Sequence, residues 1–240
     1  MTANRYEGPL CTGIVDIHHD DGSFDLDEVA VGGVIGMLIK CSEGVTYQDP
    51  SYVQVLDRLR AAKMLRGAYH FARGTSDAEA QADVFCDDVK AMCDTGGEDV
   101  LVALDLEGDL SNPRTMSTED AARFIERVAA MLRRKPLVYM GLSKGRERMR
   151  EASDRVRSVF GACDLWLAAY GPKYDPRTIE VPAPWSTYAL HQYTNGSDGP
   201  RDRELFPRAT KGFTREAQDR SCFLGTAEQL RAWWLSYGRK

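Results

Sequence analysis

The stretch Val100–Asp109 constrains the fold more than any other part of this 240-residue chain, because an uninterrupted apolar run gives way there to Asp105 and Glu107. Such a run is typical of a parallel strand that is buried on both faces. Acids at the carboxyl ends of these strands form the active sites of (β/α) barrels. Side chains alternate along a strand, so Asp105 and Glu107 face the same way, with their Cα atoms about 6.5–7 Å apart.

We interpret these two acids as candidate acid and base groups. Burying two like charges side by side costs several kcal/mol, so a strand that carries both is expected to use them in its function. For either acid taken alone, the alternative is a helix cap or an ion pair with an arginine.

The rest of the chain repeats a strand, a polar loop and a helix, and after Asp164 loops replace the helices. Apolar runs predict further strands at 12–19, 34–40, 65–71, 136–140, 164–170, 187–193 and 221–223. Apolar residues at helical spacing predict helices at 52–63, 77–92, 121–134, 144–160 and from 226 onward. The expected fold is therefore an α/β, modified TIM-like barrel, with five β/α units followed by three β-strands.

The expected domain organisation is a single barrel domain over 1–240. Its core spans about 11–237 and its polar surface insertion spans 201–218. Proline residues argue against a helix between the late strands. The final helix is expected to bury Leu230, Trp233 and Trp234.

Composition excludes several classes of protein. The net charge of −5 gives no excess of basic residues for binding phosphate groups, so nucleic acid is not an expected partner. No run approaches the roughly 18–20 apolar residues of a membrane span, and residues 1–8 lack the apolar core of a signal peptide. We therefore expect synthesis in the cytoplasm without membrane insertion. The six cysteines show no CxxC spacing, which favours buried free thiols.

Ordered motifs run along nearly the whole chain. They are Gly13–His19, Ile39–Gly44 with Tyr47–Pro50, Gly67–Phe71, Ala103–Glu107, Asp164–Tyr170, His191–Thr194 and Asp219–Thr226. In this order the chain resembles the glycoside hydrolase family 25 muramidases, the lysozymes of bacteria, fungi and bacteriophage. The resemblance implies cleavage, without metal or other cofactor, of the β-1,4 bond between N-acetylmuramic acid and N-acetylglucosamine in peptidoglycan.

The resemblance also implies roles for individual residues. Glu107 matches the family's general acid, and the other acidic site residues match Asp16, Asp105 and Asp219. The aromatic positions that line the family's sugar groove match Tyr69, Tyr139, Trp166 and Tyr193. Two positions depart from the family pattern: His18 stands where a small polar residue is usual, and Ser221 stands where asparagine is usual.

The crowded carboxylates suggest how the chemistry is divided. Repulsion from the aspartates is expected to raise the pKa of Glu107, while better hydrogen-bonded aspartates stay ionised. We favour a route in which Asp105 stabilises the substrate's own acetamido group during its attack on the anomeric carbon. Glu43, which follows the second strand, and His18, which shares a strand face with Asp16, are further candidates for substrate binding.

Two other functions remain open from the residues alone. A metal-dependent hydrolase could use the histidines at or near strand ends, which are His18, His19, His70 and His191, although three converging ligands would be needed. A non-catalytic barrel could bind wall glycan without cutting it. The favoured interpretation is a monomeric phage or prophage endolysin without a separate cell-wall-binding domain, released to the wall through a holin-type lesion or another export route.

Overall fold

The computed structural model describes residues 6–91, 99–215 and 217–237, and eight of its strands close a barrel. The strands follow the order β1-β9-β8-β7-β6-β5-β4-β2, and pairing of β1 with β2 closes the ring, while β3 extends the edge of β2. Their bounds are β1 Leu10–Ile17, β2 Gly36–Glu43, β3 Tyr47–Gln48, β4 Leu65–Phe71, β5 Val100–Asp105, β6 Leu137–Gly141, β7 Leu165–Ala168, β8 Leu190–Asn195 and β9 Asp219–Leu224.

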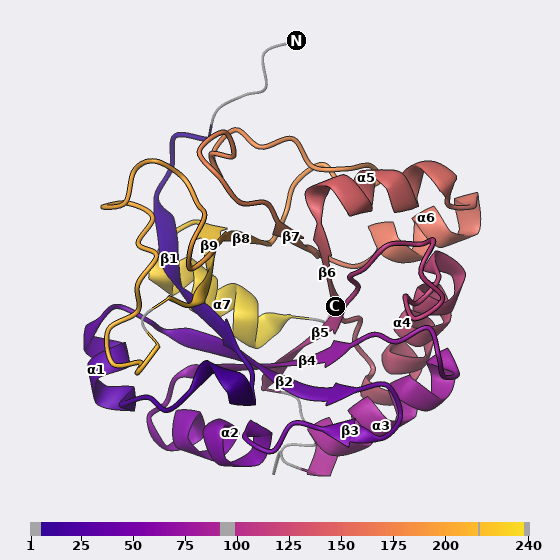
Figure 1. The fold of residues 1–240 in the computed structure, drawn as a ribbon, viewed down its shortest axis with the longest axis horizontal. Coiled ribbons are helices and arrows are strands. Elements are labelled where there is room, and N and C mark those ends of the chain that lie inside the picture. Colours follow the sequence, from indigo (N-terminus) through magenta and orange to yellow (C-terminus); the bar gives the residue numbers. More distant parts are fainter. Residues whose placement is uncertain (1–5, 92–98, 216, 238–240) are drawn as a thin grey trace.

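Helices cover the outside of the first five barrel strands (Figure 1). They are α1 Leu26–Val31, α2 Tyr52–Ala61, α3 Ala78–Ala91, α4 Thr118–Leu132, α5 Leu142–Glu151 and α6 Asp154–Gly161, with a short 3-10 helix, η1, at His19–Asp21. Loops instead of helices join β7, β8 and β9, and α7 Ala227–Ser236 follows the last strand. The predicted arrangement of five β/α units and three further strands is therefore confirmed.

Strand β9 is antiparallel to both of its neighbours, β1 and β8, whereas all the other neighbouring pairs in the ring are parallel. The start of β9 therefore lies at the end of the barrel where the parallel strands finish. Asp219, the first residue of β9, pairs in register with Asp16 near the end of β1. This reversal places an acid from the start of a strand among acids from strand ends.

Helix α7 lies across the ring of strands and closes its other end (Figure 1). Leu230 and Trp234 pack among inward-facing residues of the barrel, and the Trp234 indole donates a 2.8 Å hydrogen bond to the carbonyl of Arg66. Gly67 leaves room for this indole, because a Cβ there would lie 3.2 Å from Trp234. The barrel interior is thus a packed core with one open end.

Replacing Trp234 with alanine is expected to lower the free energy of unfolding by about 3–5 kcal/mol, since a fully packed indole leaves a cavity. Trp233→Ala on the same helix is the matched control, because Trp233 is only partly buried and should cost less. Urea denaturation of both variants measures the difference. Equal losses would contradict the role assigned to Trp234 as the plug of the barrel.

The structure differs from the sequence-based prediction in four places. Helix α1 and strand β3 were not predicted, because both are short. The helix expected over 144–160 is two helices, since Ala152 is extended and Ser153 caps α6 with a 3.3 Å bond from the amide of Val156. The irregular segment 201–218 is only partly a surface insertion, because it buries Phe206, Thr210, Phe213 and Gln218.

Other predictions agree with the structure. The helix predicted over 121–134 is α4, which begins three residues earlier, at Thr118, and Ser117 caps it by accepting a 3.0 Å hydrogen bond from the amide of Asp120. The five cysteines that the structure describes are buried free thiols, and Cys93 lies outside the described residues. Within the described ranges, no helix combines the length and apolar character needed to span a membrane.

Candidate active site

A cavity of about 470 Å³ opens at the end of the barrel opposite α7. Nine of the ten sequence-predicted site residues line it, and they are Asp16, His18, Glu43, Tyr69, Asp105, Glu107, Tyr139, Trp166 and Asp219. The cavity is also lined by His19, which the sequence offered only as a metal ligand, and by residues that the sequence did not single out, namely Asp20, Lys40, Tyr47, Phe71 and Gln192.

Strand alternation explains which side chains reach the cavity. Below the cavity, Leu38, Leu101 and Leu137 belong to the cluster inside the barrel. Two residues further along each strand, the inward positions become Lys40, Ala103 and Tyr139, and after two more on β5 comes Asp105. Polar side chains thus begin where the apolar interior ends, so the strands themselves aim the acids into the cavity.

Gln192 connects an acid to two tyrosines. Its amide nitrogen donates a 2.7 Å hydrogen bond to Asp16 Oδ2, and its amide oxygen accepts a 2.7 Å bond from the Tyr139 hydroxyl and another from the Tyr170 hydroxyl. Gln192 is almost fully buried, so this network has little freedom to rearrange. One Asp16 oxygen is thereby fixed.

The other oxygen of Asp16 and one oxygen of Asp105 are buried without a hydrogen-bond partner among the described residues. Both carboxyl groups line the cavity and are only 8% exposed. A buried acceptor without a partner costs about 1–3 kcal/mol, more when charged, so such atoms are typical of sites that a ligand completes. These two oxygens therefore lie at the buried floor of the cavity.

All four acids have raised pKa values, with burial as the first cause. For Asp16 the charge of Asp219 adds to burial, and for Asp105 the charge of Glu107 adds to it. Burial raises the pKa of Asp219 to about 6, although the Arg215 charge opposes the shift. Loss of hydration also raises the pKa of Glu107, although a hydrogen bond from the Tyr139 hydroxyl and the charge of Lys40 both act to lower it.

This pattern corrects the expected cause of the raised pKa of Glu107, which is burial and not repulsion from the aspartates. The sequence predicted a protonated Glu107 among ionised aspartates, but burial raises the pKa of the aspartates too. Glu107 lies at the exposed rim, whereas Asp16 and Asp105 lie on the buried floor. For Asp16 and Asp105, repulsion from neighbouring acids adds to the shift but is secondary to the loss of hydration.

The raised pKa of Asp219 predicts a loss of stability as pH rises. Its stabilising contribution is fully present below its ordinary pKa of 3.8 and is lost as pH rises through its folded-state pKa of about 6. Asp219→Asn removes the ionisation, so at pH 8 the variant should exceed the wild type by about 2 kcal/mol in unfolding free energy, and at pH 4 by little. Urea denaturation at both pH values measures this, with the exposed Asp154→Asn as control. A gain of equal size at pH 4 and pH 8 would contradict the prediction.

Two charged residues, Lys40 and Glu43, line one wall of the site, and Arg73 contacts Glu43. Glu43 accepts a 2.5 Å hydrogen bond from Lys40 Nζ and a 2.7 Å bond from Arg73 Nε. Burial opposes ionisation of Glu43, but these two cations outweigh it and lower the pKa of Glu43. The Lys40 ammonium also lies 4.9 Å from the centre of the Phe71 ring. Glu43 therefore positions Lys40 beside the acids.

Tyr193 does not line the cavity, contrary to expectation. It follows Gln192 on β8, so alternation turns it to the outer face of the barrel, where it packs against Phe206 and donates a 2.8 Å bond to the carbonyl of Pro207. The inward residue of this motif is Gln192. The signal that could have found it is the strand period of two, because Leu190 and Gln192 face inward and Tyr193 must then face outward. This period predicts the direction of a side chain better than its aromatic character does.

The histidines do not converge on a shared ligand position. His70 is fully buried outside the barrel wall, stacks on Phe124 at 5.0 Å and contacts Ser42 and Gln81. His191 is also fully buried and contacts the carbonyl of Ala169. Burial lowers the pKa of both to about 4. Only His18 and His19 reach the cavity, so the four histidines cannot form one catalytic metal centre.

Arg148 supports the loop that carries Glu107. It lies on α5, within the range 144–160 predicted as helix, and its side chain is fully buried. It donates hydrogen bonds of 3.0 Å to the carbonyl of Met116 and 3.2 Å to the carbonyl of Glu107. Arg148 thus fixes the backbone that follows β5, a role for which the sequence offered no signal.

Comparison with known proteins agrees with this geometry. A model of glycosyl hydrolases family 25 matches residues 15–200. The autolytic lysozyme of Clostridium acetobutylicum is 26% identical over 202 residues, which is 80% of this chain and 55% of that protein. The chain therefore spans about half the length of this relative.

Solved structures share the fold. The bacterial lysozyme of Streptomyces coelicolor superposes with a TM-score of 0.74 at 24% identity, covering 96% of this chain and 98% of that one. A family GH25 lysozyme of Aspergillus fumigatus gives a TM-score of 0.72 at 24% identity, covering 96% and 100%. At this identity the likeness concerns the fold alone.

Proposed function

Because this chain belongs to glycosyl hydrolases family 25, we propose that it hydrolyses the β-1,4 bond between N-acetylmuramic acid and N-acetylglucosamine in peptidoglycan. The observation that carries the proposal is the gathering of Asp16, Asp105, Glu107 and Asp219 in one open cavity. Glycosidic cleavage needs a proton at the leaving oxygen and negative charge near the anomeric carbon. A group of acids that share protons can supply both.

Glu107 is the proposed general acid. It lies at the rim, where a glycan enters, and its raised pKa favours the protonated carboxyl that must donate to the leaving oxygen. Arg148 holds its backbone, so the carboxyl is presented from a fixed loop. The same group, once ionised, can accept a proton from water in the second half of the reaction.

Asp105 is proposed to act on the acetamido group of the substrate. Its buried oxygen without a partner among the described residues can accept a hydrogen bond from the acetamido N–H. When that group attacks the anomeric carbon, positive charge develops beside Asp105 and favours its ionised form. Asp16 and Asp219 add negative charge nearby, so the positive transition state offsets the cost of burying these carboxylates.

The aromatic residues form the proposed sugar-binding surface. Tyr139 and Trp166 lie edge to face at 4.7 Å, and Tyr69 and Trp166 at 6.4 Å, on neighbouring walls of the cavity. Aromatic faces combine apolar area with polar tips, which suits a sugar ring and its hydroxyl groups. His18 completes the proposed binding surface at the rim, together with Glu43, which accepts a hydrogen bond from Lys40 and so positions that ammonium group.

The proposed place of action is the bacterial cell wall, reached after release from the cell, as in an endolysin. We propose that the protein works as a monomer that binds glycan strands, since a dimer that covered the cavity would obstruct them. An apparent mass near 26.8 kDa on size-exclusion chromatography would support the monomer, and twice that mass would contradict it.

Digestion of purified peptidoglycan tests the activity. Wild-type protein should generate new N-acetylmuramic acid reducing ends, identified by mass spectrometry, and EDTA should not diminish them. Loss of cleavage in EDTA would favour a metal-dependent hydrolase. Binding without cleavage would favour a glycan-binding barrel.

A further inference from the structure

Three consecutive residues after β1 converge at the rim of the cavity. His18, His19 and Asp20 each offer a potential metal-ligating atom, and these atoms lie within 4.8 Å of one another. Asp20 Oδ1 lies 3.1 Å from His19 Nε2, and Asp20 Oδ2 lies 3.7 Å from His18 Nδ1. The proposed glycosidase chemistry uses neither His19 nor Asp20.

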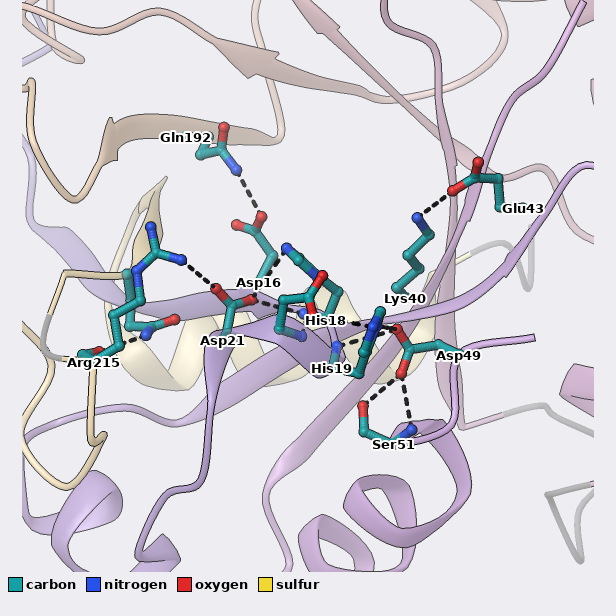
Figure 2. Close-up of polar contacts among 12 residues, drawn as sticks. Asp16, His18, His19, Asp21, Lys40, Glu43, Asp49, Ser51, Gln192 and Arg215 are labelled. Carbon is teal, nitrogen blue, oxygen red and sulfur yellow. Dashed lines mark hydrogen bonds and ion pairs between the residues drawn. The ribbon is translucent and has the colours of Figure 1, made fainter. Parts of the chain in front are cut away.

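A buried carboxylate orients His19 from behind. Asp49 Oδ2 accepts a 3.1 Å hydrogen bond from the His19 amide and lies 3.1 Å from ring Nδ1 (Figure 2). The Asp49 side chain is fully buried, and its other oxygen accepts bonds of 2.9 and 2.6 Å from the amide and hydroxyl of Ser51. Burial opposes ionisation of Asp49, but these bonds outweigh it and lower its pKa.

This arrangement assigns the proton of a neutral His19 ring to Nδ1, which donates to Asp49. The Tyr47 hydroxyl oxygen, 3.0 Å from Nδ1, can share that proton as a second acceptor. The lone pair on Nε2 then faces the Asp20 carboxylate at 3.1 Å. Two acceptors so close repel each other unless a proton or a cation lies between them. A carboxylate behind a histidine is also the usual outer shell of a zinc site.

We propose that His18, His19 and Asp20 bind a divalent transition-metal cation of the zinc class. Two imidazole nitrogens and one carboxylate oxygen are a ligand set that favours zinc over magnesium or calcium. Tetrahedral zinc with bonds of about 2.0–2.1 Å needs ligand atoms about 3.3 Å apart. Asp20 Oδ1 already lies 3.1 Å from His19 Nε2, close to that value, and one ligand atom from each of the three residues lies within 4.8 Å of the others.

Little has to move for a cation to bind. The two imidazoles must approach each other, and the His18 side chain is 40% exposed and can rotate, while Asp49 keeps the His19 ring in place. The contact given up is the 3.3 Å bond from the Asp20 amide to His18 Nδ1. Water would fill the fourth coordination position, as in zinc sites with three protein ligands.

Bound zinc should inhibit the enzyme, and this step depends on the proposed function. All three ligands line the same cavity as Asp16 and Asp105. A cation there would occupy the entrance used by the glycan and would oppose the positive charge that develops on the sugar. The site would therefore be inhibitory, in contrast to the catalytic metal of a hydrolase.

Calorimetric titration with zinc chloride tests the site without reference to activity. Wild-type protein should bind one zinc ion per chain at micromolar concentration, and magnesium chloride should give no heat of binding. His19→Gln should weaken zinc binding at least tenfold, whereas Asp154→Asn, at an exposed acid on α6, should leave it unchanged. Equal affinity of the wild type and His19→Gln would overturn the proposal.

A second variant tests the outer shell. Asp49→Asn should weaken zinc binding by about 10–100-fold, because His19 loses its carboxylate partner. Thermal denaturation without metal shows whether each variant is folded. Should either variant fail to fold, Asp20→Asn takes its place, since Asp20 is exposed and removes a ligand directly. Unchanged affinity in every folded variant would overturn the site.

Hydrolysis measured over a zinc titration tests the inhibition. Turnover of peptidoglycan should fall with a midpoint near the calorimetric Kd and return when EDTA is added. Zinc binding without inhibition would overturn the blocking role. Absence of hydrolysis in zinc-free wild type would instead contradict the proposed function and leave the calorimetric result standing.

Discussion

Glu107→Gln is expected to lower kcat on peptidoglycan by about 10²- to 10⁴-fold with little change in KM, since general acid catalysis typically contributes that much. Glutamine keeps the shape of the side chain but cannot donate a proton to the leaving oxygen. Glycan binding should survive because the floor and the aromatic walls of the cavity are untouched. Reducing-end release against substrate concentration measures both constants.

Asp109→Asn is the matched control for that variant. Asp109 lies two residues further along the same loop, pairs with Lys144 at 2.7 Å and does not line the cavity. It should retain wild-type kcat and KM. A Glu107→Gln enzyme with wild-type kcat would remove Glu107 from the chemistry, and an equal loss in Asp109→Asn would attribute the effect to the loop.

Asp105→Asn should lower kcat by about 10²- to 10³-fold, the loss typical of removing one group that stabilises transition-state charge. The change removes the negative charge but leaves an oxygen that can accept a hydrogen bond. Substrate should therefore still bind. Because a buried ionisable group becomes neutral, the variant should be at least as stable as the wild type in urea.

The same variant distinguishes two routes of cleavage. If Asp105 acts through the substrate's acetamido group, wild-type enzyme should fail on glycan whose N-acetylmuramic acid has been de-N-acetylated. A covalent glycosyl adduct on Asp105, detected by mass spectrometry of the quenched reaction, would contradict that route and make Asp105 a nucleophile.

Features within a single strand were predictable from the sequence. The run before Asp105 indicated a buried strand, and Asp105 and Glu107 both line the cavity, although β5 ends at Asp105 and Glu107 lies in the loop after it. Trp166 and Tyr69 were placed through the family resemblance. Tyr193 was misplaced because aromatic character was preferred to the strand period, which assigns Gln192 to the inside.

Features that depend on pairing between distant segments were not predictable. The reversal of β9 brings Asp219 beside Asp16, and no local pattern shows the direction of a strand. The burial of Arg148 depends on carbonyl groups of two other segments. The sequence around Arg148 therefore gives no sign that this side chain is buried. The raised pKa values of the aspartates likewise follow from enclosure by many strands at once.

The position of the last strand and helix has a consequence for synthesis of the protein on the ribosome. Both edges of β1 are paired only after β9 has been synthesised, and the barrel interior is closed only after Trp234 has been added. A nascent chain therefore exposes one edge of β1 and an open apolar interior until residues 219–234 have emerged. Assembly of the acids follows the same order, since Asp219 arrives last, so no shorter nascent chain carries the complete cavity.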